Sequence, residues 1–384
     1  MTGVPRPPDG APWLAAIAIV ALVTSYTLVG VVRAHAIRAN VMDHPNERSS
    51  HREPTPRGGG LGAVIALLLA TTVGAASLDR LSWRFGVVGA ALTALAAVGW
   101  LDDRRSLPVL PRLLTHVAAG VATAWLAALV GVAEPGSAMG LTYLAWWVFW
   151  SVSAINVVNF MDGIDGLIAS QIALFAGVLA LRASPGSLAA VFAVSLAFAC
   201  AGFLAWNWAP ARIFLGDVGS GALGLAAVVA GLLVMADRRV GFATVYLPLL
   251  PLFLDATVTI GRRALRGERL TSPHRSHLYQ RLANGGWGHA RVSVLYLTAA
   301  ALGGAASLAP HGARALLSAV YAAALLALGI GLERLAPFDS TLRAQGREGP
   351  AGGARQVRPA HGDRAPGGEV AHSEKMSSDL SVRR

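Results

Sequence analysis

Long apolar segments recur along the whole chain, separated by short polar stretches, and this pattern constrains the fold more than any other feature. A helix needs about 20 apolar residues to cross the hydrocarbon core of a bilayer. Composition agrees, because 54% of the 384 residues are hydrophobic and only 14% are charged, against about 25% charged in soluble domains. The sequence predicts an all-α integral membrane protein, a polytopic bundle of about eleven transmembrane helices. The predicted spans are 13–32, 60–78, 85–101, 113–132, 141–158, 164–182, 187–206, 219–236, 240–261, 292–309 and 314–334.

Arginines concentrate in two of the segments between these spans, 33–57 and 262–291. In an eleven-span arrangement both lie on the same side of the membrane, and the loops on the other side are shorter and poorer in arginine. Positively charged loops mark the cytoplasmic side, which predicts an outside N-terminus and an inside C-terminus. The same distribution explains the formal charge of +11. Because no basic groove interleaved with aromatic residues is present, we reject nucleic acid as a partner.

Composition changes near the end of the chain. From about Phe338 onward the sequence is polar, rich in Gly, Arg and Ser, and without periodicity. Such a segment cannot bury enough apolar surface to offset the entropy of ordering. The sequence therefore predicts a membrane domain over 1–337 and a disordered cytoplasmic tail over 338–384.

Five groups of polar residues gather at the predicted cytoplasmic ends of the spans, where ionisable side chains are costly and therefore indicate function. The first group runs from Asp43 to Gly60 and ends in Arg57, Gly58, Gly59 and Gly60. Glycines let a backbone approach a ligand closely, and arginine suits phosphate. An ordinary arginine-rich loop is the alternative interpretation.

The second group is the pair Asp102 and Asp103, which follows the third span and is itself followed by Arg104, Arg105 and Arg112. Adjacent carboxylates repel each other, which raises the pKa of one unless a cation lies nearby. The pair is thus a candidate acid/base or metal-proximal site. A solvated cap that pairs with its arginines explains it equally well.

The third group, Asn156–Gly166, is the most specific. Asn156, Asn159 and Asp162 are three residues apart, so that neighbours share a helical face, and Asp165 follows within a glycine-containing turn. Carboxylate and amide oxygens with open positions suit Mg²⁺, which prefers a few protein oxygens together with substrate phosphates. Helix capping accounts for one of these residues but not for four.

The fourth group comprises Asn207 and the segment Arg212–Gly221, which contains Phe214 and Asp217. Asp217 precedes an apolar helix, so that an N-cap is one interpretation of it. Its flanking glycines and its predicted cytoplasmic position favour a ligand role.

The fifth group lies in the longest predicted inside loop, over 272–281. His274 and His277 could share a helical face and, with Arg275, clamp a pyrophosphate; a structural histidine pair is the alternative. Zinc is less attractive, because no thiolate or third clustered histidine completes a tetrahedral set. Asp255, inside the ninth span, is a further acid without an evident partner.

Taken together, these groups resemble the polyprenyl-phosphate N-acetylhexosamine-1-phosphate transferase superfamily, of the glycosyltransferase family 4 type, which starts many bacterial cell-envelope glycans. The resemblance covers roughly 40 to 290. Residues 156–166 resemble the family pattern Asn-x-x-Asn-x-x-Asp-Gly-x-Asp-Gly, and residues 214–220 resemble Phe-Met-Gly-Asp-x-Gly-Ser. Asp102 and Asp103 match its paired aspartates, and 56–61 matches the glycine-rich start of its second span.

The resemblance implies a transfer from a UDP-N-acetylhexosamine-type donor to polyprenyl (undecaprenyl) phosphate, with release of UMP, at a cytoplasmic site of the bacterial cytoplasmic membrane. It implies Mg²⁺, with Mn²⁺ as an alternative, held by Asn159 and Asp217. Asp102 or Asp103 would orient or deprotonate the acceptor phosphate. A homodimer is one option for the oligomeric state. The residues implied to face the nucleotide-sugar are Asn156, Asp162, Asp165, Asn207, Phe214, His274, Arg275 and His277, with Asp165, Asn207 and Phe214 nearest the uridine.

One departure bears on the pathway. Transferases that make the peptidoglycan precursor, and the common N-acetylglucosamine-phosphate enzymes, carry a histidine-rich motif where this chain has Ser-Pro-His-Arg-Ser-His. That stretch looks more like the subgroup that initiates O-antigen or related polysaccharides, often with a deoxy-N-acetylhexosamine. Phospho-N-acetylmuramoyl-pentapeptide transferase is the alternative within the family. A transporter or flippase is the alternative of another class, although transporter acids lie near the midplane on broken helices, whereas here they gather at one face.

Overall fold

A computed structural model describes residues 10–45, 53–132, 138–270 and 274–338. Those residues form a helical bundle with one two-stranded antiparallel ribbon, in which β1 (Met42–Asp43) pairs with β2 (Thr55–Pro56). The all-α prediction is confirmed. Asn46, Glu47 and their neighbours in the first polar group, the start of the fifth group, and the tail over 339–384 lie outside the described residues.

Every predicted span corresponds to helix. Among the described residues, ten helices are long and apolar enough to cross a membrane, and α6, with 16 residues, is shorter. The ninth predicted span is interrupted, because α9 (Phe242–Tyr246), η1 (Leu247–Leu249) and α10 (Leu250–Leu265) follow one another where two prolines remove backbone donors. The other long helices are α1 (Gly10–Arg38), α2 (Gly60–Ser77), α3 (Trp83–Arg105), α4 (Val109–Leu129), α5 (Ala138–Met161), α6 (Leu167–Arg182), α7 (Leu188–Asn207), α8 (Asp217–Arg238), α12 (His289–Leu308) and α13 (His311–Leu335).

Helix α8 is the centre of the bundle, and nearly all its residues are buried against α2, α3, α5, α6 and α7. Small residues allow this close packing. A Cβ atom added at Gly60 of α2 would come within 2.3 Å of the Gly219 Cα atom, and one added at Gly224 would come within 2.8 Å of the Ile155 Cα atom. The ends of α3 and α5 and the start of α2 are thereby brought around the first turn of α8.

The outer helices carry large apolar side chains on their exposed faces. In α13, for example, Leu316, Val320 and Ile330 are more than half exposed. An apolar exterior of this extent is unfavourable in water and is expected in lipid. Together with the long apolar helices, it makes the chain a multi-pass membrane protein.

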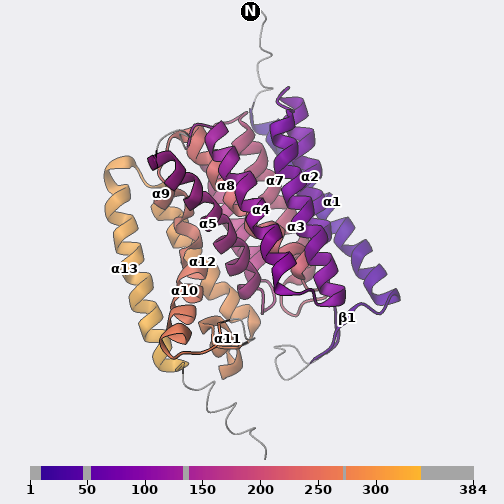
Figure 1. Cartoon of the computed structure of the whole chain (residues 1–384), viewed down its shortest axis with the longest axis vertical. Coiled ribbons are helices and arrows are strands. Elements are labelled where there is room, and N and C mark those ends of the chain that lie inside the picture. Colours follow the sequence, from indigo (N-terminus) through magenta and orange to yellow (C-terminus); the bar gives the residue numbers. More distant parts are fainter. Residues whose placement is uncertain (1–9, 46–52, 133–137, 271–273, 339–384) are drawn as a thin grey trace, which may run out of the picture. The chain divides into compact units, whose positions relative to one another are not determined.

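The two arginine-rich segments lie at the same end of the bundle, as the sequence predicts. Figure 1 shows β1 and the short helix α11 (Leu278–Leu282) together at that end, where α13 also finishes. Phe338, the first residue of the predicted tail, is buried there, with the guanidinium of Arg266 4.6 Å from its ring centroid.

Candidate active site

The site is built around the first turn of α8. Gly216 precedes the helix with a φ of 76°, and Asp217 is its first residue. The backbone N–H groups of Asp217 and Val218 donate to the two carboxylate oxygens of Asp103, at 2.9 and 3.2 Å. Asp103, from the end of α3, thus satisfies the exposed donors and the positive dipole of this helix start. The interpretation of Asp217 as the cap is wrong, because the capping carboxylate comes from α3.

With the cap supplied by Asp103, the carboxylate of Asp217 is available to other groups. Its Oδ1 accepts from Asn159 Nδ2 at 3.0 Å and lies 3.3 Å from Arg57 Nη2. Its Oδ2 lies 3.9 Å from Arg112 Nη1. Residues from three elements far apart in the sequence therefore direct donors at one carboxylate: Arg57 after β2, Arg112 in the first turn of α4 and Asn159 near the end of α5.

Arg57 joins Asp217 to the paired aspartates. Its Nε lies 2.8 Å from Asp103 Oδ1, so that one guanidinium spans both carboxylates. Burial alone would lower the pKa of Arg57, but the negative charges of Asp103 and Asp217 outweigh it and raise the pKa. Arg57 therefore stays protonated beside Asp217.

The two adjacent aspartates point in different directions. Asp102 accepts from the Leu107 N–H at 2.6 Å and from Arg112 Nη1 at 2.5 Å, while Asp103 holds Arg57 and the start of α8. Each carboxylate has its own arginine, which offsets the repulsion expected of the pair. Both side chains are buried, so the pair is not a solvated cap, although each aspartate does pair with an arginine as that interpretation expects.

Asp162 differs from the other acids of the site. It follows α5 directly, is half-buried, and has no side-chain hydrogen bond or ion pair within the described part of the chain. Burial raises the pKa of the Asp162 carboxyl well above its usual value, and the charges of Asp217, Asp103 and Asp165 raise it further against the opposing effect of Arg57. Such a carboxyl is free to contact a ligand.

A cavity of about 100 Å³ lies against these groups, between α3, α4, α5 and α8. Asp102, Arg112, Asn159 and Asp217 form its polar part. The rest of its wall is mostly apolar, with His116 and Asn156 as further polar residues, so that it could accept a ligand with a charged head and an apolar tail. Asn156 also lines it, and the amide of Asn156 donates to Val152 O of its own helix at 2.7 Å.

Asp165 and Asn207 fasten the loops around the site. The Asn207 amide accepts from Gly166 N and donates to Ile213 O, both at 3.0 Å. Asp165 Oδ2 accepts from Ala211 N at 3.0 Å and lies 3.2 Å from His289 Nδ1. Sequence reasoning missed His289, because a single histidine 124 residues from its partner carries no local signal.

The glycine-rich segment packs against protein. Gly59 N and Gly60 N donate to Phe214 O and Leu215 O, both at 2.9 Å, and Phe214 N donates to Pro56 O at 2.8 Å. A Cβ atom on Gly59 would lie 2.7 Å from the Phe203 ring. The close approach that Gly59 and Gly60 permit is therefore between helices and loops of the protein, and a contact of this segment with a ligand stays a prediction. Phe214 lies half-buried at this junction.

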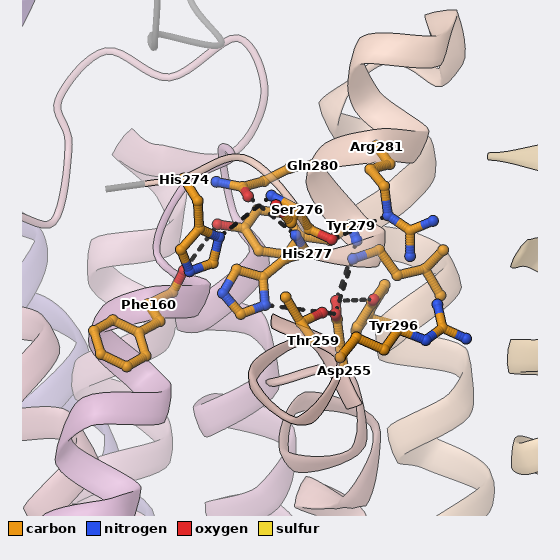
Figure 2. Close-up of polar contacts among 12 residues, drawn as sticks. Phe160, Asp255, Thr259, His274, Ser276, His277, Tyr279, Gln280, Arg281 and Tyr296 are labelled. Atoms are coloured by element: carbon orange, nitrogen blue, oxygen red, sulfur yellow. Dashed lines mark hydrogen bonds and ion pairs between the residues drawn. The ribbon is translucent and has the colours of Figure 1, made fainter. Parts of the chain in front are cut away.

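The loop 274–277, which we call the histidine loop, is not helical, so His274 and His277 do not share a helical face as the sequence suggested. The side chain of His277 is only 2% exposed, and its Nδ1 lies 3.5 Å from Asp255 Oδ1 (Figure 2). Burial and the neighbouring His277 lower the pKa of His274 to about 4, so that His274 is neutral near pH 7. A pyrophosphate clamp formed by His274, Arg275 and His277 stays a prediction. Half-buried Arg275 is the loop's permanent cation.

A divalent cation fits the donor set without a dense cluster of acids. The described residues contain no group of three or more His, Cys, Asp or Glu side chains placed to hold a metal. Mg²⁺ is bound in many enzymes by one or two carboxylates, with waters and substrate phosphates completing its shell. Asp217 and the adjacent Asn159 amide, which can turn to present its oxygen, could hold such an ion.

Comparison with known proteins gives a consistent result. Residues 85–236 match the family described as glycosyl transferase family 4. A decaprenyl-phosphate N-acetylglucosaminephosphotransferase of Mycolicibacterium smegmatis is 31% identical over 320 residues, covering 74% of this chain and 79% of the relative. An undecaprenyl-phosphate α-N-acetylglucosaminyl 1-phosphate transferase of Thermotoga maritima is 29% identical, covering 67% and 78%. A phospho-N-acetylmuramoyl-pentapeptide-transferase of Synechococcus is 31% identical over 276 residues, covering 66% and 78%.

Proposed function

The chain belongs to glycosyl transferase family 4, and from that premise we propose that it transfers an N-acetylhexosamine 1-phosphate from a UDP-sugar to polyprenyl phosphate. The observation that carries the proposal is the convergence of Asn159, Arg57 and Arg112 on the Asp217 carboxylate, beside a cavity with an apolar wall. The names of the mycobacterial and Thermotoga relatives support the same acceptor and sugar class.

In the proposed reaction an oxygen of the acceptor phosphate attacks the β-phosphorus of the donor. A new P–O bond forms, the bond from the β-phosphorus to the bridging oxygen breaks, and UMP leaves with that oxygen. Such transfers ask the protein mainly for positioning and charge neutralisation. Arg112, held by Asp102 and lining the cavity, would meet the acceptor phosphate, and Arg57 would neutralise donor phosphate charge.

The acids divide the remaining tasks. Asp103 would keep the first turn of α8 and Arg57 in place. Asp162, without a side-chain partner in the described residues, would contact the donor sugar or nucleotide. Asp165 and Asn207, which tie the loops 162–166 and 207–213 together, would shape the uridine side of the site.

We include Mg²⁺, with Mn²⁺ as a substitute, in the proposal. Asp217 and Asn159 would hold it, since carboxylate and amide oxygens are the ligands it prefers. When bound, the ion supplies charge stabilisation for the phosphate oxygens of the donor and of the leaving UMP. Removal of divalent ions with EDTA is expected to stop transfer, and added Mg²⁺ to restore it.

The membrane orientation belongs to the same proposal. The site lies at the end of the bundle that carries both arginine-rich segments, and such loops face the cytoplasm. A cytoplasmic site in a bacterial plasma membrane gives access to nucleotide-sugars and would start a cell-envelope polysaccharide, such as an O-antigen. The Ser-Pro-His-Arg-Ser-His stretch supports that pathway over peptidoglycan.

The decisive experiment incubates membranes containing the protein with polyprenyl phosphate and each of a panel of UDP-sugars, and measures the mass of the lipid product. We expect a lipid-linked sugar pyrophosphate with a UDP-N-acetylhexosamine. The Synechococcus relative justifies including UDP-N-acetylmuramoyl-pentapeptide, and product from that donor alone would select the peptidoglycan reaction. No product with any donor, together with solute uptake into proteoliposomes, would instead favour a transporter.

A further inference from the structure

A buried carboxylate in the middle of α10 is the polar group that the reaction leaves unexplained. The side chain of Asp255 is 2% exposed, and α10 belongs to a candidate membrane span. A buried charge in such a place is costly unless hydrogen bonds compensate for it. The sequence offers no evident partner for Asp255, whereas the fold supplies several from residues that follow it in the chain.

Figure 2 shows side chains and backbone from three elements directed at this carboxylate. Its Oδ1 accepts from Leu278 N at 2.8 Å and Thr259 Oγ1 at 3.2 Å, and its Oδ2 accepts from Tyr279 N at 3.1 Å and Tyr296 Oη at 2.6 Å. The two backbone donors are the first N–H groups of α11. Asp255 therefore fixes the point at which the histidine loop enters α11.

From α11 the contact continues to the catalytic turn. Tyr279 is fully buried, and its hydroxyl donates to Phe160 O at 3.0 Å. The fit is close, since a Cβ atom added at Gly163 would lie 2.3 Å from that hydroxyl oxygen. Burial, followed by the charges of Asp255 and Asp162, raises the pKa of Tyr279 well above its usual value, so that the hydroxyl keeps its proton and remains a donor. Phe160 and Gly163 flank the turn that carries Asp162.

We propose that Asp255 is a positioning residue that holds the loop carrying His274 and Arg275 against the turn carrying Asp162, and thereby sets the donor-binding half of the site. Asp255 touches no substrate in this arrangement and acts through α11 and Tyr279. The proposal rests on the proposed function for its catalytic consequence. Its structural part, the anchoring of α11 by Asp255, stands independently of any substrate.

The test uses the full-length protein in detergent or nanodiscs, with Asp255→Asn as the main variant and Tyr296→Phe as a milder one that removes a single donor. Thr298→Val is the matched control, because its hydroxyl is on the same helix as Tyr296 and donates only to Val294 O of that helix. Hydrogen–deuterium exchange of peptides spanning 274–287 reports on the anchor. Steady-state kinetics with the UDP-sugar and polyprenyl phosphate varied in turn report on its consequence.

We expect faster exchange in 274–287 for Asp255→Asn, with peptides from α7 and α8 unchanged, and no change for Thr298→Val. Displacement of a substrate-holding loop by about 1 Å can cost on the order of 100-fold in rate, so kcat/KM for the donor should fall about 10- to 100-fold with a raised donor KM. The acceptor KM should stay constant. Tyr296→Phe should show the same pattern with a smaller amplitude.

Two results would overturn the proposal. One is unchanged exchange in 274–287 in both variants. The other is faster exchange with both KM values unchanged and only kcat lowered, which is the signature of a smaller folded fraction. If the wild-type protein transfers no sugar phosphate, the proposed function fails, while the exchange result still decides whether Asp255 anchors α11.

Discussion

Two carboxylates at the same end of the bundle, Asp217 at the start of α8 and Asp255 in α10, have opposite surroundings. The side chain of Asp217 is 24% exposed, borders a cavity, and has contacts of 3.0 to 3.9 Å with groups that could turn toward a ligand. The side chain of Asp255 is 2% exposed and accepts four hydrogen bonds of 2.6 to 3.2 Å. The first is open to chemistry, and the second is committed to structure.

The difference shows that acids buried in a membrane protein can have two distinct roles. An intramembrane carboxylate is a functional hypothesis by default, yet that default does not separate an acid that binds from an acid that positions. The two kinds of acid differ in how many hydrogen bonds from the protein the carboxylate already accepts. Asp162 belongs with Asp217 by this criterion, and Asp103 belongs with Asp255, since both of its oxygens serve the start of α8 and Arg57.

The largest effect is expected from Asp217→Asn. The substitution keeps the volume of the side chain and exchanges the ionisable carboxyl on which Arg57, Arg112 and Asn159 converge for a neutral amide, so transfer of sugar phosphate should fall at least about 100-fold, as for other losses of transition-state charge stabilisation. The measurement is the initial rate of lipid-linked product formation. Asp237→Asn at the other end of α8, where the carboxylate accepts from Ser184 N at 2.7 Å, is the matched control and should keep full activity. Full activity in Asp217→Asn would remove Asp217 from the metal site.

Sequence reasoning recovered most of the membrane fold, because apolar segments of span length are local features. It also located the acids at the end of α3, directly after α5 and at the start of α8, whose clustering at span ends is visible in the sequence. It did not find the capping role of Asp103 or the contact between His289 and Asp165, because each depends on residues more than 100 positions apart in the sequence. The partners of Asp255 were missed at shorter range: Thr259 is four residues away, and the donors from α11 and α12 are 23 to 41 residues away, in segments whose return to α10 no periodicity in the sequence shows.

Asp103→Ala should act on both stability and activity. Loss of an N-cap costs about 1–2 kcal/mol of stability, and here it also leaves half-buried Arg57 with one carboxylate fewer. We expect a lower Tm in detergent and a rate reduced about tenfold or more, through the displaced guanidinium. Asp103→Asn, which keeps one acceptor for the helix start, should retain more of the Tm than of the rate. If the transfer rate instead falls only in proportion to Tm in both variants, Asp103 serves stability alone.

Asp162→Asn separates the two classes of acid by the sign of its effect on stability. Because the folded-state pKa of Asp162 is raised, the folded protein binds its proton more tightly than the unfolded chain does, and the ionised carboxylate costs stability as pH rises above the unfolded pKa. At pH 7 the neutral amide should therefore raise Tm while donor kcat/KM falls. Asp255→Asn should lower Tm under the same conditions. The comparison fails if Asp162→Asn is the more destabilising of the two.

The smallest effect is expected from Thr259→Val, which removes the weakest of the four hydrogen bonds to Asp255, at 3.2 Å, and nearly conserves side-chain volume. The carboxylate keeps its bonds to α11 and Tyr296, so the loss should be about 0.5–1.5 kcal/mol of stability, the usual net value of one hydrogen bond. Both KM values should stay within experimental error of wild type. A donor KM raised as far as in Tyr296→Phe would show that the alignment of Asp255 depends on every donor around it. Asp255 would then be as sensitive to the loss of one contact as the more exposed cluster at Asp217, despite its burial.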